Sequence, residues 1–114
     1  MREAPMPDNL FTALPPLAPD ADEQFTDLLR RQGLRIERIV SSGQASPPGF
    51  WYDQTEGEWV VVLSGSAGLR LEHEPRTRVL RPGDHLDIPP GCRHRVEWTE
   101  LGVATVWLAV FYQG

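Results

Sequence analysis

The sequence predicts an all-β fold, a jelly-roll barrel or sandwich, and three observations lead to this prediction. After Gly33 the residues alternate between polar and apolar or are β-branched, which is the pattern of half-buried strands. Turn residues interrupt the pattern at short intervals, as in Arg81-Pro82-Gly83 and Pro89-Pro90-Gly91. The length of 114 residues is enough for one domain with a core of its own.

The chain begins with a proline-rich arm. Residues 1–19 contain five prolines, which keep the backbone extended because proline fixes φ and donates no hydrogen bond. Four large apolar side chains lie in the same segment: Leu10, Phe11, Leu14 and Leu17. We expect the arm to pack on its own barrel or on a partner subunit.

One short helix is predicted next, over residues 21–31. Asp20 and Glu23 have the spacing of a capping box, Phe25, Leu28 and Leu29 recur at i, i+3 and i+4, and Gly33 ends the pattern. The expected organisation is therefore an arm and helix over residues 1–33 and a β-barrel over residues 34–114, forming a single domain overall.

Eight segments of the remaining chain have strand character and are separated by turn signals. They are residues 34–40, 49–53, 58–63, 68–73, 76–80, 85–88, 93–99 and 104–112. Eight short strands fit a jelly roll.

Composition narrows the class of function. The 16 acidic and 11 basic side chains give a net charge of -5, which argues against nucleic-acid binding and favours a small-molecule ligand. Cys92 is the only cysteine, so an internal disulfide and a thiolate cluster are excluded and a cytoplasmic protein is expected. The sequence has no apolar run long enough for a signal peptide or a membrane span.

The stretch from Gly83 to His94 carries the most specific motif. Gly83 is followed after five residues by Pro89, then by Gly91 and, after two more residues, by His94. This spacing resembles the second sequence motif of the cupins. The resemblance implies a jelly-roll barrel, commonly a homodimer, that holds its ligand inside, and it implies that His94 is a metal ligand.

The first cupin motif is only half present. Glu58, six further residues and Gly65 match its second half, whereas the two histidines expected before the glutamate are absent. One spacing puts Trp51 and Asp53 in their places, and the other puts Tyr52 and Gln54 there. Side chains at i and i+2 share a strand face, so only one of these pairs can point into the barrel.

The two alternatives predict different sites. With Trp51 and Asp53 inward, Asp53, Glu58 and His94 could hold one divalent ion, Mn²⁺, Fe²⁺, Zn²⁺ or Ni²⁺. With Tyr52 and Gln54 inward, the site would be metal-free, and Glu58 or His94 could act as a general base in an apolar cavity.

Aromatic residues are concentrated near this expected site. Trp51 and Tyr52, with Gln54, are candidate ligand-binding residues, and Trp98 could narrow the mouth or stack on a flat ligand. The polar residues His85 and Asp87 alternate with apolar neighbours and are expected to point outward.

Two classes of function remain open. The cupins that this sequence resembles include isomerases, cyclases and oxygenases, some of them in polyketide biosynthesis. The first class of function is therefore an enzyme for an aromatic or polyketide-like substrate, with Glu58 and His94 as catalytic residues. The second is a binding or regulatory module that holds a ligand without changing it. For either, the apolar arm and the aromatic C-terminal strand predict a homodimer.

Overall fold

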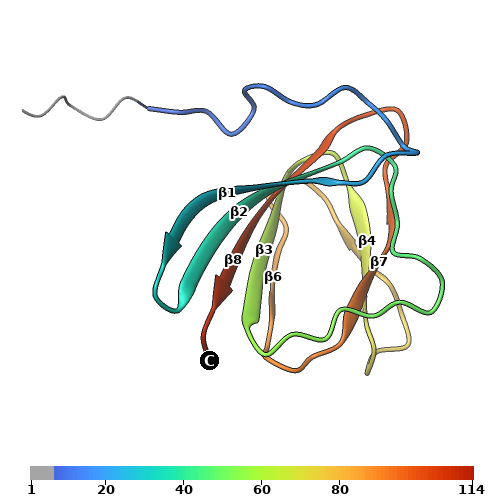
Figure 1. The fold of residues 1–114 in the computed structure, drawn as a ribbon. Coiled ribbons are helices and arrows are strands. Elements are labelled where there is room, and N and C mark those ends of the chain that lie inside the picture. Colours follow the sequence, from blue (N-terminus) through green and yellow to red (C-terminus); the bar gives the residue numbers. More distant parts are fainter. Residues whose placement is uncertain (1–6) are drawn as a thin grey trace, which may run out of the picture.

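The computed structural model describes residues 7–114 and shows an antiparallel β-barrel built from two sheets (Figure 1). The five-stranded sheet has the order β1-β2-β8-β3-β6, and the three-stranded sheet has the order β5-β4-β7. The first six residues of the proline-rich arm, including Pro5, lie outside the described residues. The all-β prediction is confirmed.

Eight strands occur in the described residues, and seven of them match predicted segments to within a few residues. The strands are β1 (Gln24–Arg31), β2 (Leu34–Ser41), β3 (Gly57–Ser64), β4 (Ala67–Leu71), β5 (Arg78–Leu80), β6 (His85–Ile88), β7 (His94–Thr99) and β8 (Thr105–Tyr112).

The predicted helix over residues 21–31 is wrong, because this segment forms β1. It pairs with β2 in an antiparallel hairpin that turns at Gly33, whose φ of 73° is a left-handed conformation that glycine adopts without strain. A bulge between Asp27 and Leu29 breaks the alternation of β1. The three apolar residues that suggested a helix are therefore those of a bulged strand, and the pairing with β2 outweighs the local pattern.

The predicted strand over residues 49–53 is reduced to one bridge between Tyr52 and His94. Pro47 and Pro48 remove two amide donors, and Gly49 has a φ of 79°, so the segment cannot form a regular ladder. The loop nevertheless runs alongside β7, because Ser46 forms hydrogen bonds with Val96 and Tyr52 forms hydrogen bonds with His94.

The segment from Gly83 to His94 has the predicted turn, strand, turn geometry. Gly83 and Gly91 both have positive φ, at 91° and 75°, and β6 runs between the two turns. The second turn is closed by the Cys92 amide, which donates to the Pro89 carbonyl at 3.1 Å. β7 begins directly afterwards at His94, which this turn therefore delivers to the barrel.

The core lies between the two sheets, where one face of each strand is apolar. It is formed by Ile39, Val60, Val62, Ala67, Leu69, Leu71, Leu80, Ile88, Trp107, Ala109 and Phe111. On β6, His85 and Asp87 are exposed and Ile88 is buried, which agrees with the expectation for that strand. The described part of the chain contains no helix long and apolar enough to cross a membrane.

Candidate ligand-binding site

A cavity of about 200 Å³ opens inside the barrel. Its polar lining consists of Glu23, Arg35, Glu37, Tyr52, Gln54, Glu58 and His94. Its apolar lining consists of Phe25, Ile39, Val60, Leu69, Val96, Trp107 and Phe111. An apolar pocket with a few convergent polar groups is the usual form of a small-molecule site.

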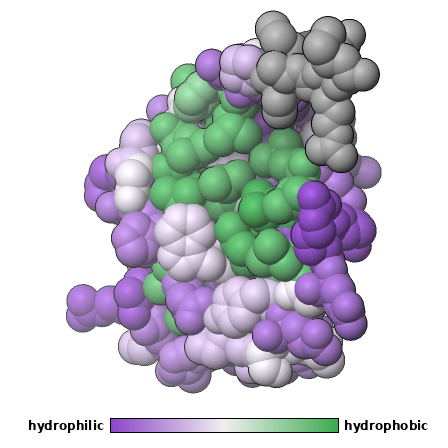
Figure 2. All heavy atoms as spheres, turned by 90° about the vertical axis from the view of Figure 1, so that its left-hand side faces the viewer, coloured by the Kyte–Doolittle hydropathy of each residue, from purple (hydrophilic) through white to green (hydrophobic). Residues whose placement is uncertain are grey.

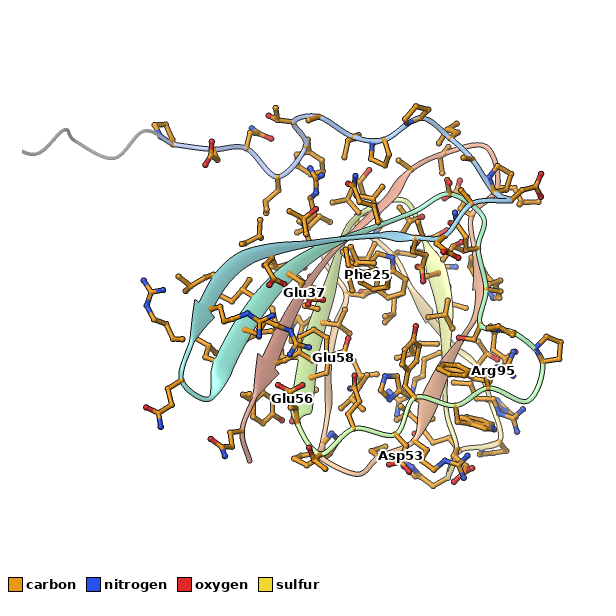
Figure 3. All side chains as sticks on the ribbon, viewed as in Figure 1. Phe25, Glu37, Asp53, Glu56, Glu58 and Arg95 are labelled. Carbon is orange, nitrogen blue, oxygen red and sulfur yellow. The ribbon has the colours of Figure 1, made fainter. Side chains whose placement is uncertain are left out.

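The strands of the larger sheet place most of these side chains by simple alternation. On β2, Arg35, Glu37 and Ile39 share the face toward the cavity, and on β3 the residues on that face are Glu58 and Val60. In Figure 3, Phe25, Glu37 and Glu58 turn toward the central space of the barrel, coming from β1, β2 and β3. The cavity is therefore built mainly on a rigid sheet.

Glu58 and His94 form an ion pair across the barrel, one from each sheet. His94 Nε2 lies 3.3 Å from Glu58 Oε1, and the two side chains are only 4% and 11% exposed. Gln54 Nε2 donates to the same Oε1 at 3.2 Å. Within residues 7–114 no donor is recorded for Glu58 Oε2, so this oxygen is available to a ligand.

The surroundings of His94 favour its protonated form. Burial by itself would lower the pKa of His94, but the hydrogen bond to Glu58, the contact of Nδ1 with the Cys92 carbonyl at 3.1 Å and the charge of Glu58 together raise the pKa above its usual value. The imidazole can therefore donate from both nitrogens.

The loop before β3 positions Tyr52 and Gln54 at the cavity. The Tyr52 amide donates to the His94 carbonyl at 2.7 Å, and the His94 amide donates to the Tyr52 carbonyl at 3.1 Å. The two rings stack with centroids 5.3 Å apart. Gln54 is fixed through its carbonyl, which accepts from the Gly91 amide at 2.8 Å.

The structure thus realises the alternative in which Tyr52 and Gln54 point inward. Asp53 is exposed and points away from the cavity at the bottom of Figure 3. Trp51 is also outside the cavity lining, and it packs instead near the guanidinium groups of Arg70, Arg93 and Arg95, about 6 Å from its ring. The expectation that Trp51 and Asp53 line the site is not met, because residues 51 and 53 lie on the opposite side of the loop from Tyr52 and Gln54.

Trp98 is not part of the cavity lining either. It covers Gly68 on the neighbouring strand, where a side chain larger than hydrogen would collide with the indole ring, and it is 38% exposed. Trp98 therefore packs on the surface of the smaller sheet and does not narrow the mouth.

The residues present do not form the expected metal site. No group of three or more histidine, cysteine, aspartate or glutamate side chains in the described residues could hold an ion. Glu58 and His94 are directed at each other, and Asp53 is too far outside to join them. A site with two ligands falls short of the three that protein metal centres ordinarily need.

Sequence reasoning missed Glu23, which lies in the cavity lining just before β1. Its Oε2 accepts a hydrogen bond from Ser41 Oγ, and Ser41 Oγ accepts one from Trp107 Nε1 at 3.0 Å. Burial raises the pKa of Glu23, although the bond from Ser41 opposes this. Glu23 had been interpreted as a capping residue, and no local signal could show that β1 carries it to the barrel.

Arg35 and Glu37 were also missed. Arg35 Nε donates to Glu37 at 2.9 Å, its NH1 contacts Glu56 at 3.2 Å, and its guanidinium lies 4.0 Å from the centroid of the Phe111 ring. In the sequence, Arg35 and Glu37 alternate with Leu34 and Ile36, which indicates a strand with two different faces. The usual interpretation of this pattern places the apolar residues inside the barrel and the charged residues outside.

A family model described as "Cupin domain" matches residues 38–111. A solved structure from Ralstonia eutropha, named a "putative mannose-6-phosphate isomerase", is 57% identical to this chain, covers 96% of this chain and 100% of its own, and superposes with a TM-score of 0.92. No curated protein matches the sequence.

More distant solved structures share the fold. A cupin superfamily protein from Desulfitobacterium hafniense is 14% identical, with 85% of this chain and 83% of its own covered and a TM-score of 0.70. A cupin family protein with a double-stranded β-helix fold from Methanocaldococcus jannaschii is 15% identical, with coverages of 82% and 84% and a TM-score of 0.65. At this identity they speak for the fold alone.

Proposed function

The chain belongs to the cupin family, and we propose that its barrel binds a small organic ligand against the Glu58–His94 pair. The observation that supports this most directly is the burial of the pair beside an open cavity. Burying charged groups is unfavourable unless they are paired, and a well-packed apolar pair would stabilise the fold at least as well. A role in ligand binding explains why charged groups occupy this position.

The aromatic part of the lining supports an aromatic or polyketide-like ligand. Phe25 lies at the cavity and is 54% exposed, whereas Trp107 and Phe111 are buried deeper in the barrel. A flat apolar ring could pack between these side chains while its polar end meets Glu58 Oε2. The size of the cavity favours a molecule of about one ring.

For a reaction, we propose proton transfer by the pair itself. Glu58 Oε2 would take a proton from one carbon of the ligand and return it to the neighbouring carbon, while the protonated His94 would stabilise the negative charge that develops in between on an oxygen of the ligand. Isomerisation of an aldose to a ketose is one reaction of this type, and the relative from Ralstonia eutropha is named for such a reaction.

The alternative is a module that binds its ligand without changing it. This alternative is supported by the donor set, because within residues 7–114 no group of three or more histidine, cysteine, aspartate or glutamate side chains could hold a metal ion. In that case Glu58 and His94 serve only as a polar anchor.

The test is ligand binding by the unmodified protein and two variants. We expect compounds of about one aromatic ring to perturb NMR signals of Tyr52, Trp107 and His94, and Glu58→Gln to weaken binding about tenfold through loss of one charge-assisted hydrogen bond. The matched control is Glu72→Gln, which removes an exposed carboxylate paired with Arg93. Binding that is equally affected by both variants, or that perturbs only surface signals, would contradict the proposal.

A further inference from the structure

The charged groups of the cavity are unequally divided between acids and bases. Three carboxylates line it, Glu23, Glu37 and Glu58, against one guanidinium, Arg35, and one imidazole, His94. The relative named for a sugar phosphate would lead one to expect a basic site, because phosphate groups are usually held by free arginine or lysine side chains or by helix N-termini.

Neither basic group is free to receive an anion. Arg35 is occupied by Glu37 at 2.9 Å and by Glu56 at 3.2 Å. His94 Nε2 is directed at Glu58, and its Nδ1 at the Cys92 carbonyl. An anionic ligand in the cavity would lie among three carboxylates and would have to break an internal ion pair to gain a cation.

The same walls suit a cation. Four aromatic rings line the cavity, those of Phe25, Tyr52, Trp107 and Phe111. Aromatic faces attract ammonium and guanidinium groups, and nearby carboxylates add to that attraction.

Arg35 shows how such a group is accommodated. Its guanidinium lies 4.0 Å from the centroid of Phe111 and contacts carboxylates on either side, Glu37 and Glu56. The wall of the cavity thus already holds one cation, supplied by the chain itself, between a ring and two acids. Tyr52 lines the cavity together with Glu23 and Glu58, and its pKa is raised by burial first and then by the charges of these two carboxylates. The Tyr52 ring also stacks on His94, with centroids 5.3 Å apart.

From this distribution we propose that the cavity selects small organic cations, amines or guanidines on an apolar group, over anions such as sugar phosphates. The inference rests on the proposed function, because it concerns the same cavity and names the chemical class of its ligand. Glu58 Oε2, which accepts no recorded hydrogen bond within residues 7–114, and the Tyr52 ring would hold the cationic end. Phe25 and Trp107 would cover the apolar end.

The experiment compares three probes of nearly equal shape that differ in charge: benzylamine, benzyl alcohol and benzoate. Dissociation constants are measured by NMR titration of the unmodified protein at pH 7 and moderate salt. We expect benzylamine to bind about tenfold more tightly than benzyl alcohol, and benzoate to bind most weakly, because one charge–charge contact in a partly buried site corresponds to about that factor. Mannose and mannose 6-phosphate form a second pair, in which the phosphate is expected to weaken binding.

Two variants test whether the cavity carboxylate is responsible. Glu58→Gln is expected to remove most of the preference for benzylamine over benzyl alcohol, while Glu72→Gln, with the same change of net charge on an exposed side chain, should leave the preference within about twofold of the unmodified protein. If Glu58→Gln does not fold, a salt titration of the benzylamine and benzyl alcohol affinities of the unmodified protein supplies the test, because added salt should weaken only the binding of the charged probe.

The outcomes separate the two proposals. Benzoate or mannose 6-phosphate binding as tightly as its uncharged partner would overturn the selection for cations and leave the binding function standing. Equal binding of benzylamine and benzyl alcohol would do the same. No binding of any probe at millimolar concentration would overturn both.

Discussion

The two faces of the five-stranded sheet differ in how they combine charged and apolar side chains. On β2, the residues toward the cavity are Arg35, Glu37 and Ile39, whereas Ile36, Arg38 and Val40 lie on the outer face. On β8 the outer residues Val106, Leu108 and Val110 are all apolar and pair with Val40, Arg38 and Ile36. The inner face carries the cavity's acids beside the apolar core, and the outer face carries further apolar side chains outside that core.

The apolar outer face is visible as one continuous area when the molecule is viewed from the side of β1 and β2 (Figure 2). The arm crosses part of it, held by Arg38, whose NH1 donates to the Leu10 and Thr12 carbonyls and whose NH2 donates to Gln24. The acids thus lie toward the cavity, whereas the outer face presents a continuous apolar area of the kind that often marks a protein–protein contact.

The largest effect is expected from removing the imidazole of His94 from the inner face. His94→Ala leaves Glu58 buried without its charged partner, so we expect the free energy of unfolding to fall by about 3–5 kcal/mol. Urea denaturation measures this change. The exposed pair of Arg93 and Glu72 is the control, since Arg93→Ala should lower the free energy by about 0–1 kcal/mol. Equal losses in the two variants would show that the inner pair is not coupled as the geometry indicates.

A second, smaller effect is expected on the outer face. Arg38→Ala removes three hydrogen bonds between β2 and the arm or β1, and we expect it to lower the free energy of unfolding by about 1–3 kcal/mol. The residue is only 8% exposed, so its stem is lost from a packed position as well. The decisive measurement is hydrogen exchange, which should accelerate over residues 10–18 and leave β3 unchanged. Acceleration over the whole barrel would contradict a local clamp.

The two faces differed in how far the sequence could predict them. The turns around Gly83 and Gly91 were predictable, because glycine and proline act locally, and they place His94 correctly. The inner positions of Glu23, Arg35 and Glu37 were not, because they depend on the pairing of β1 with β2 and on which face of the hairpin turns inward. The bulge at Leu28 removed the alternation that would have identified β1 as a strand.

The interior should also be recognised by its dependence on pH. The pKa of His94 is raised in the folded protein, so its stabilising contribution is complete below the unfolded value of about 6.5 and is lost as the pH rises through the folded value. Glu23, whose pKa burial raises, acts in the same direction from about pH 4.5 upward. We therefore expect the free energy of unfolding to decline as the pH rises from about 6.5 through the folded pKa of His94, by no more than about 1.4 kcal/mol per pH unit for each proton involved.

Glu58→Gln provides the control for this dependence, because it removes the carboxylate that holds the proton on His94. The variant should lose most of the decline above pH 6. If the free energy of unfolding of the variant declines with pH as in the unmodified protein, titratable groups other than His94 cause the decline.

Self-association tests the apolar outer face most directly. Substitutions on this face are expected to have the smallest effect on the free energy of unfolding of the single chain. We propose that a second copy covers the apolar outer face, because this face forms one continuous apolar area in Figure 2 and because Phe11 and Leu28 are 50% and 44% exposed on and beside the arm. A homodimer in solution is the expected mass. Phe11→Ser combined with Leu28→Ser should convert it to a monomer while changing the unfolding free energy of each chain by about 0.5 kcal/mol or less per substitution, since exposed side chains contribute little to the fold. Light scattering that shows a monomer for the unmodified protein at all concentrations would contradict the homodimer.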